Sequence, residues 1–192
     1  LDRPGALVGR ILSQREDTYS VITVDGLRPA HPAGVLFHKG DEEARPAVGD
    51  WVALETSPEE GALVTDVLPR RSRFLREAPG GRGVAQVVAS NVDVVFLVTP
   101  ISEVNPNRLE RFMVAICAGG AEPMVVLSKG DLASPQQAVA AAAEVRGLMK
   151  GLKVLCTSTP WNQREAIGEE FDPVLRPAAT YALVGASGAG KS

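Results

Sequence analysis

Short apolar runs alternate with turn-forming residues along the first 70 positions, which is the pattern of an all-β domain. Glycine, proline and aspartate separate the runs, as in Asp25-Gly26 and Lys39-Gly40-Asp41. About five short strands in a segment of this length suit a small closed barrel. We therefore predict an OB-like β-barrel over residues 1–70, although periodicity alone does not separate it from an SH3-like barrel. The predicted strands are Ala6–Leu12, Tyr19–Val24, Val35–His38, Asp50–Glu55 and Ala62–Leu68.

Residues 92–192 instead alternate apolar runs with helical patterns, which is typical of a doubly wound α/β domain. The run Val92–Val98 is what a strand buried on both faces of a parallel sheet requires. A helix is predicted to follow, with Asn105 as its N-cap, Pro106 at its first position and Gly119-Gly120 at its end. The other predicted elements are strands at Met124–Leu127, Val154–Thr157 and Tyr181–Val184 and a helix from the capping-box residue Ser134 to Gly151.

A complete GxxxxGK[ST] motif directly follows the last predicted strand. It consists of Gly185-Ala186-Ser187-Gly188-Ala189-Gly190-Lys191-Ser192. Its glycines allow successive backbone N–H groups to surround nucleotide phosphates without Cβ clashes. Lys191 would reach the β- and γ-phosphates, and the Ser192 hydroxyl would bind Mg²⁺. A glycine-rich turn that binds no phosphate is the alternative, which the lysine and serine in these positions disfavour.

Two further polar segments follow predicted strands. Ser128-Lys129-Gly130-Asp131 resembles the guanine-reading Asn-Lys-x-Asp sequence of GTPases: Asp131 could accept from both N1–H and the amine of guanine, while Lys129 lies along the purine. Thr157-Ser158-Thr159 resembles a short base-contacting segment, with Ser158 and Thr159 at the base. Read alone, the first segment is an ordinary turn. However, ligands bind at the carboxyl ends of strands in open α/β sheets, and three such ends carry these motifs.

The order of the motifs points to a circularly permuted GTPase domain. A conventional GTPase has its phosphate loop first, whereas here Ser128–Asp131 precedes Gly185–Ser192. A barrel, a guanine reader and then a phosphate loop resembles the bacterial family of small-ribosomal-subunit-dependent, circularly permuted GTPases. Four further segments carry the resemblance: Val48-Gly49-Asp50-Trp51-Val52, Leu68-Pro69-Arg70-Arg71-Ser72, Gln86 through Asp93, and Arg108-Leu109-Glu110-Arg111.

The resemblance implies an OB-fold that contacts ribosomal RNA, GTP hydrolysis stimulated by the small ribosomal subunit, and a role in late maturation of that subunit. It implies GTP or GDP with Mg²⁺ at the site, and Zn²⁺ in a C-terminal domain that this chain does not contain. The switch I and Asp-x-x-Gly elements are also missing from the chain, so no catalytic residue and no zinc ligand is assigned. Ser128 stands where the family usually has asparagine. Because serine is shorter and has fewer donors, we expect weaker guanine-nucleotide binding.

The ends of the sequence indicate part of a longer protein. The chain begins with Leu1 rather than methionine, and Ser192 lies inside the phosphate-loop motif. A phosphate loop needs the N-terminus of the helix that follows it. We therefore expect the 192-residue chain alone to bind nucleotide poorly and to hydrolyse none.

Composition and charge refine this interpretation. The chain is 45% hydrophobic and 22% charged, which excludes disorder as its main state. A net charge of −3 argues against a protein that coats nucleic acid with its whole surface. Residues 71–91 are predicted to be a basic linker between the domains, which is either a mobile connector or a strip that contacts RNA phosphates. The candidate RNA contacts are Arg70, Arg71, Arg73 and Arg76.

The remaining candidates suggest no other chemistry. Cys117 and Cys156 are too few for a disulfide framework, and we predict both in the core. Their spacing, and that of His31 and His38, fits no common zinc pattern.

Aromatic residues and hydropathy complete the sequence-based expectations. Trp51 is predicted in the barrel core, and Phe74 is the better candidate for stacking on RNA. The longest apolar run, Val94–Val98, is too short to span a membrane, so we expect no membrane partner. No charged-then-apolar signal segment opens the sequence, which makes a cytoplasmic location the default expectation, and we expect a monomer.

Two other functions stay open on the sequence. One is an RNA-binding barrel module with a degenerate, non-hydrolysing nucleotide site, which Ser128 favours. The other is an ATP-dependent P-loop enzyme, which Asp131 disfavours because adenine offers no partner for its carboxylate.

Overall fold

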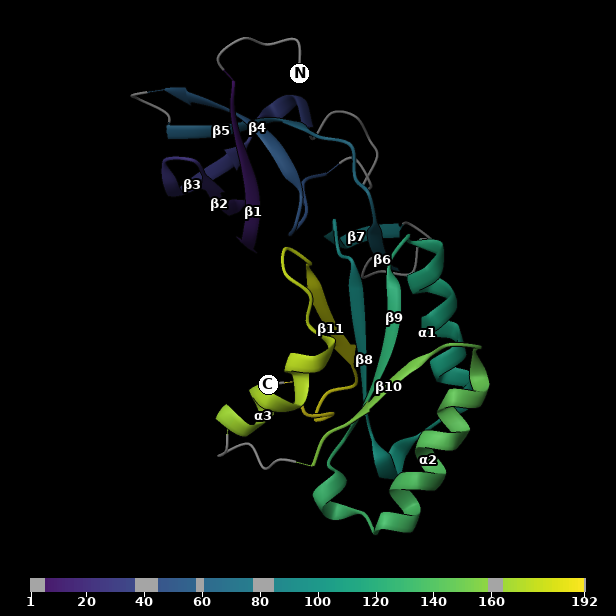
Figure 1. Ribbon diagram of the computed structural model, residues 1–192. Coiled ribbons are helices and arrows are strands. Elements are labelled where there is room, and N and C mark those ends of the chain that lie inside the picture. The colour runs from purple at the N-terminus through teal and green to yellow at the C-terminus, as the bar shows by residue number, and fades with distance from the viewer. Residues whose placement is uncertain (1–5, 37–44, 58–60, 78–84, 159–163, 192) are drawn as a thin grey trace. The chain divides into compact units, whose positions relative to one another are not determined.

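The computed structural model describes residues 6–36, 45–57, 61–77, 85–158 and 164–191 (Figure 1). The chain divides into two compact units, Leu1–Asn91 and Val92–Ser192, and each is described by itself. No helix within the described ranges is long and apolar enough to cross a membrane.

Five strands of the first unit close into a barrel in the order β1-β2-β3-β5-β4, and β1 also pairs with β4. Neighbouring strands are antiparallel except β3 and β5, which run parallel. Alternate side chains fill the interior, where Ile11, Val21, Val52, Leu54 and Val64 are fully buried. The predicted OB-like barrel is confirmed. The strands are β1 (Leu7–Arg15), β2 (Thr18–Thr23), β3 (Gly26–Pro32), β4 (Trp51–Ser57) and β5 (Gly61–Val67).

The third strand lies earlier in the chain than predicted. The predicted strand at Val35–His38 is wrong over its described residues, because Gly34–Leu36 forms a 3₁₀ turn, and residues 37–38 lie outside the described part of the chain. β3 contains prolines, which normally argue against a paired strand. Pro29 pairs with β2, but pairing with β5 begins only at Ala30. The missing N–H of Pro29 therefore falls where one side of the strand is unpaired, and the proline is tolerated.

Residues 71–91, predicted as a linker, contain two strands. β6 (Arg73–Glu77) and β7 (Ala85–Ser90) pair antiparallel and belong to the first unit. The basic segment is thus built into a hairpin rather than left as an extended connector.

A junction cluster of polar residues (Gly49, Asp50, Arg70, Ser90 and Asn91) joins the barrel to the end of this hairpin. Asp50 is 0% exposed, and both its carboxylate oxygens accept from the Arg70 guanidinium, at 2.7 and 2.6 Å. The Asn91 amide donates to the Gly49 carbonyl at 3.1 Å. A Cβ at Gly49 would collide with the Ser90 carbonyl oxygen, so only glycine allows the two backbones to approach this closely.

Four parallel strands form the sheet of the second unit, in the order β10-β9-β8-β11. β8 and β9 are buried along nearly their whole length, as their apolar sequences predict. Helices α1 and α2 cover one face of the sheet, and α3 packs against the other, so the predicted doubly wound class is confirmed (Figure 1). The elements are β8 (Val94–Pro100), α1 (Pro106–Ala118), β9 (Glu122–Ser128), α2 (Pro135–Leu148), β10 (Lys153–Cys156), α3 (Arg164–Phe171) and β11 (Tyr181–Gly185).

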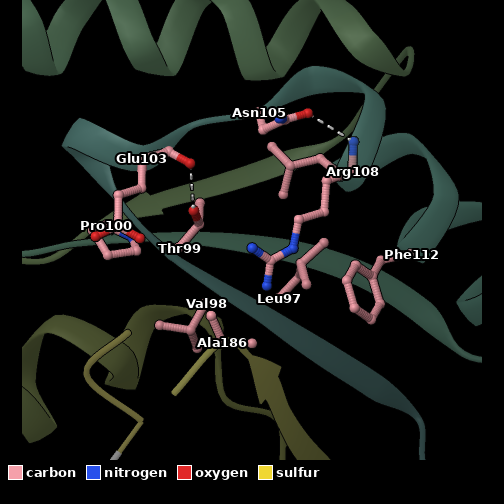
Figure 2. A pocket seen from close by; sticks show the side chains of 11 residues that line it. Leu97, Val98, Thr99, Pro100, Glu103, Asn105, Arg108, Phe112 and Ala186 are labelled. Carbon is pink, nitrogen blue, oxygen red and sulfur yellow. Dashed lines mark hydrogen bonds between the residues drawn. The ribbon is translucent and has the colours of Figure 1, made fainter. Parts of the chain in front are cut away.

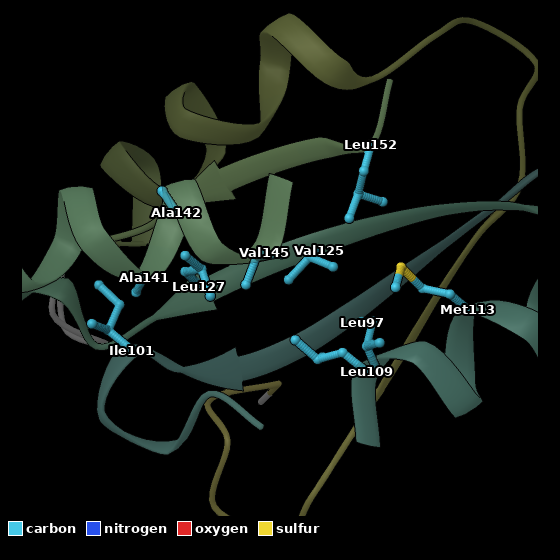
Figure 3. Packing of buried hydrophobic residues seen from close by; sticks show 10 residues of the cluster. All are labelled: Leu97, Ile101, Leu109, Met113, Val125, Leu127, Ala141, Ala142, Val145 and Leu152. Carbon is cyan, nitrogen blue, oxygen red and sulfur yellow. The ribbon is translucent and has the colours of Figure 1, made fainter. Parts of the chain in front are cut away.

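The main core lies between the sheet and the first two helices. Leu97 and Val125 point from the strands toward Leu109 of α1 and Val145 of α2 (Figure 3). Both helices begin as predicted. Asn105 accepts the Arg108 N–H, and the capping box at the start of α2 is complete. α3 was not predicted from the sequence.

Three residues predicted in the core are exposed. Cys117 follows the buried Ile116 on α1, and one residue turns the helix by about 100°, which places the thiol toward solvent. Cys156 is exposed at the end of the edge strand β10. Trp51 is 43% exposed, because it points outward from β4 where its neighbour Val52 points inward.

Candidate nucleotide-binding site

The carboxyl ends of β9, β10 and β11 lie at the same edge of the sheet, because all its strands are parallel. Each end leads into a predicted motif. We call them the base-reading loop (Ser128–Asp131), the base wall (residues 157–158) and the phosphate loop (residues 185–191). The order of the strands places β9 between β10 and β8, and β8 next to β11.

The phosphate loop needs glycine at several positions. A Cβ at Gly185 would collide with the carbonyl oxygen of Val98 on β8. Gly188 and Gly190 have φ angles of +75° and +89°, in the left-handed region. The Lys191 ammonium donates to the Ala186 carbonyl at 2.5 Å, so the loop folds back on itself. The sequence therefore makes the compact turn that a phosphate cradle requires.

The base-reading loop packs directly on the base wall. Lys129 adopts a left-handed conformation, with φ of 59°. The Gly130 N–H donates to the Thr157 carbonyl at 2.9 Å, and a Cβ at Gly130 would lie only 3.0 Å from that oxygen. The side chains of Lys129 and Asp131 are exposed. The backbone of this loop is thus fixed while its two charged side chains remain available to a ligand.

Ser128 contacts the phosphate loop. Its hydroxyl donates to the Ala189 carbonyl at 2.6 Å, and the two residues are 4% and 1% exposed. The sequence analysis assigned Ser128 to the guanine-reading segment, as a shorter residue in place of the usual asparagine. In the structure its hydroxyl links the base-reading loop to the phosphate loop, across 61 positions of sequence.

One residue at this edge was missed by sequence reasoning. The Glu170 carboxylate, on α3, accepts the backbone N–H of Ser158 at 3.3 Å. No motif contains Glu170, and the only sequence signal would have been a short helix after the base wall. Cys156, immediately before the wall, is exposed at its surface, but partial burial raises the pKa of its thiol while Arg146 opposes that shift.

A small pocket adjoins the phosphate loop at the end of β8 (Figure 2). Leu97 and Phe112 contribute apolar surface, and Ala186 belongs to the phosphate loop. The Arg108 side chain extends from α1 into the pocket, with its guanidinium 6.0 Å from the centre of the Phe112 ring. Arg108, one of the residues that carry the family resemblance, thus lies beside the phosphate loop.

The candidate RNA contacts differ from one another. Arg70 is committed to Asp50 in the junction cluster, with its side chain only 12% exposed. Arg71 and Arg73 have exposed side chains on and beside the hairpin. Phe74 is half-buried within β6. The structure therefore gives Arg70 a structural contact and leaves Arg71 and Arg73 on the surface.

Two predicted site residues, Thr159 and Ser192, fall outside the described part of the chain, as does His38, and the side chain of Arg76 is likewise not described. His31 is exposed on β3, with Nδ1 3.3 Å from the Asp17 carbonyl oxygen. Among the described residues, no group of three or more histidine, cysteine, aspartate or glutamate side chains could hold a metal ion. The donor set that zinc prefers is therefore not assembled in these ranges.

Comparisons with known proteins agree with the geometry. The sequence model of the RsgA GTPase family matches residues 67–192. The small ribosomal subunit biogenesis GTPase RsgA of Opitutus terrae is 40% identical over 197 aligned residues, covering 97% of this chain and 52% of that protein. The protein of the same name from Syntrophotalea carbinolica is 35% identical over 185 residues, covering 91% of this chain and 49% of that protein. The chain therefore spans about half the length of the curated relatives it matches.

Two solved structures share the fold. The crystal structure of YjeQ from Thermotoga maritima has a TM-score of 0.70 at 22% identity, covering 97% of this chain and 63% of that one. YloQ, described as a circularly permuted GTPase, has a TM-score of 0.64 at 20% identity, covering 98% and 63%. These likenesses confirm the predicted fold, a closed barrel followed by a doubly wound α/β domain.

Proposed function

The chain belongs to the RsgA GTPase family, and on that premise we propose that the protein binds and hydrolyses GTP during late maturation of the small ribosomal subunit. The observation that carries this proposal is the arrangement of three loops at one sheet edge. The base-reading loop is hydrogen-bonded to the base wall on one side and to the phosphate loop on the other. A ligand with a purine at one end and phosphates at the other fits such an arrangement.

Each loop has a distinct role in this proposal. The Asp131 carboxylate accepts from N1–H and the exocyclic amine of guanine, and Lys129 lies along the base. Ser158 of the base wall contacts the base, and Thr159, which follows it in the sequence, is assigned the same role. The backbone N–H groups of Gly185–Lys191 surround the phosphates, and the Lys191 ammonium moves from the Ala186 carbonyl to a phosphate oxygen. Mg²⁺, when bound, would neutralise charge on the phosphates, with the Ser192 hydroxyl as its protein ligand.

We further propose that the barrel and the hairpin contact ribosomal RNA. Arg71, Arg73 and Arg76 would release counterions from phosphates along one strip. The protein would act as a cytoplasmic monomer with the small ribosomal subunit as its partner. Arg70 contributes to this surface only indirectly, since its guanidinium binds Asp50.

The second candidate function is an RNA-binding module whose nucleotide site no longer turns over. Ser128 in place of asparagine is the feature that favours it. The hydrogen bond from Ser128 to Ala189 argues against it. A contact of this kind holds the phosphate loop in the fixed geometry that a working nucleotide site needs.

Competition binding tests the proposal. Labelled GDP is bound to the longest natural form of the protein and displaced by GTP or ATP. We expect GTP to compete and ATP to fail even at about a hundredfold excess, because adenine leaves the Asp131 carboxylate unpaired. Equal competition by ATP would contradict guanine recognition. Absence of any GDP binding would favour the RNA-binding module.

A further inference from the structure

We propose that Glu170 is a positioning residue for base recognition, which holds the base wall in place through the backbone N–H of Ser158. The inference rests on the proposed guanine-binding function of this site. Glu170 lies on α3, outside every motif that the sequence analysis identified, and its carboxylate contacts the base wall from a separate element.

The contact itself joins an ionised side chain to a loop backbone. Oε1 of Glu170 lies 3.3 Å from the Ser158 nitrogen, and 12 positions of sequence separate the two residues. Glu170 is half-buried, whereas Ser158 is exposed. Hydrogen bonds to a carboxylate are stronger than those between neutral groups. The base wall is therefore fixed from outside its own strand.

The core fixes the position of the carboxylate. Phe171, the next residue on α3, packs edge-on against Phe96, with ring centroids 5.3 Å apart and an interplanar angle of 74°. Phe96 is buried in the middle of β8 and also stacks on Tyr181 of β11 at 5.2 Å. α3 is thus anchored to β8, which itself packs on β11, at the residue adjacent to Glu170. The carboxylate consequently has a defined place from which to hold Ser158.

The base wall in turn supports the base-reading loop. The Thr157 N–H donates to the Leu127 carbonyl, and the Thr157 carbonyl accepts from Gly130, both at 2.9 Å. A Cβ at Gly130 would lie 3.0 Å from the Thr157 carbonyl oxygen and 3.2 Å from the Ser158 Cβ, so the loop and the wall are closely packed. A displaced wall would therefore shift Gly130 and, with it, the adjacent Asp131.

The position of this contact predicts which part of the ligand it serves. β10, which leads into the wall, and β11, which leads into the phosphate loop, are the two edge strands of the sheet. The contact to the phosphate loop is instead made by Ser128. Loss of the Glu170 carboxylate should thus weaken binding of the base and leave binding of the phosphates unchanged.

Partial ligands separate the two effects. The longest natural form of the protein is loaded with labelled GDP, which is displaced by unlabelled GDP, guanosine or pyrophosphate. For Glu170→Ala we expect the dissociation constants of GDP and guanosine to rise by about tenfold and that of pyrophosphate to stay the same. In turnover assays, KM for GTP rises and kcat does not change.

Three variants make the result specific. Glu170→Gln keeps an acceptor oxygen at the same reach and should restore most of the affinity. Glu170→Asp keeps the charge but is one methylene shorter, so it should behave like Glu170→Ala. Glu169→Ala removes an exposed carboxylate from the same helix and should leave all three dissociation constants unchanged.

Two results would overturn the inference while GDP still binds the wild-type protein in preference to ADP. One is guanosine binding that is the same in Glu170→Ala as in Glu169→Ala. The other is an equal loss for guanosine and pyrophosphate, which would mean that Glu170 only stabilises the fold. A wild-type protein that does not prefer GDP to ADP would instead refute the proposed function, and the inference with it.

Discussion

In the junction cluster a buried carboxylate, Asp50, is neutralised by Arg70, whereas at the nucleotide site the charged side chains of Lys129 and Asp131 are exposed and only their backbones are held. Both regions lie where a strand or hairpin ends and both are polar. They differ in what their charges contact: Asp50 and Arg70 of the junction cluster pair with each other, whereas the side chains of Lys129 and Asp131 face outward.

This difference separates a structural role from a binding role. In a buried ion pair the two charges bind each other, so few of their hydrogen-bonding groups are left for a ligand. Removal of one partner lowers the stability of the fold, because the other charge stays buried and unpaired. Exposed charges on a fixed backbone cost little in the free protein and can pair with a ligand without reorganisation. Aspartate occurs in both regions, and its substitution is therefore expected to affect stability at Asp50 and ligand binding at Asp131.

The largest effect is expected from Arg70→Ala. The substitution leaves the Asp50 carboxylate buried without its guanidinium partner, which should lower the free energy of unfolding of the first unit by about 3 kcal/mol. Chemical denaturation measures this loss. Arg73→Ala removes an exposed arginine from the hairpin and should cost about 1 kcal/mol or less. Equal losses in the two variants would show that the junction cluster is not held by its ion pair.

Gly185→Ala should have the next largest effect. The added Cβ meets the Val98 carbonyl oxygen, so β8 and β11 must separate at the phosphate loop. We expect a loss of stability of about 1–3 kcal/mol and at least about tenfold weaker GDP binding. Gly147→Ala is the matched control, because its Cβ would lie in open space on α2 and should raise stability by about 0.4–1 kcal/mol. Unchanged GDP binding in Gly185→Ala would contradict the assigned geometry.

Asp131→Ala tests the expected role of an exposed charge at the nucleotide site. Since the carboxylate is exposed, stability should change by about 0.5 kcal/mol or less. GDP binding should weaken by about 10- to 100-fold while ADP binding stays as it is, because only guanine pairs with the carboxylate. Calorimetric titration with both nucleotides provides the measurement. A parallel loss for GDP and ADP would place Asp131 elsewhere than at the base.

The smallest effect is expected at Ser128. Ser128→Ala removes the bond to Ala189 and should weaken pyrophosphate and GDP by about three- to tenfold without changing guanosine, the reverse of the pattern expected at Glu170. Ser128→Asn should tighten GDP binding, because asparagine is longer and offers two N–H donors where serine has one O–H. Calorimetric titration of the two variants and the wild type gives the three dissociation constants. Unchanged constants in both variants would show that Ser128 has no role in nucleotide binding.

The sequence predicted elements whose signals are local. β8 is predicted by an apolar run, and the phosphate loop by an eight-residue motif. α1 is predicted by its N-cap Asn105 followed by a proline, and α2 by a capping box that begins at Ser134. Each depends on neighbours in the chain, so a single sequence suffices.

The failures depend on partners distant in the sequence. β3 tolerates Pro29 only because pairing with β5 starts one residue later. The hairpin of β6 and β7 is identified only by the pairing between its two strands. Contacts between Arg70 and Asp50, 20 positions apart, and between Glu170 and Ser158, 12 apart, have no spacing rule. Propensity cannot show them, because they arise from tertiary packing.

GTP turnover by the longest natural form of the protein, measured with and without purified small ribosomal subunits, tests the central claim most directly. We predict slow hydrolysis alone and a rise of at least about tenfold with subunits, since a bound partner can complete a site that the free protein holds only in part. A flat rate with intact binding to subunits would contradict the GTPase assignment and favour an RNA-binding module. A GTP hydrolysis rate that subunits do not change, together with no binding to subunits, would contradict the proposed function and leave only the assignment of the fold.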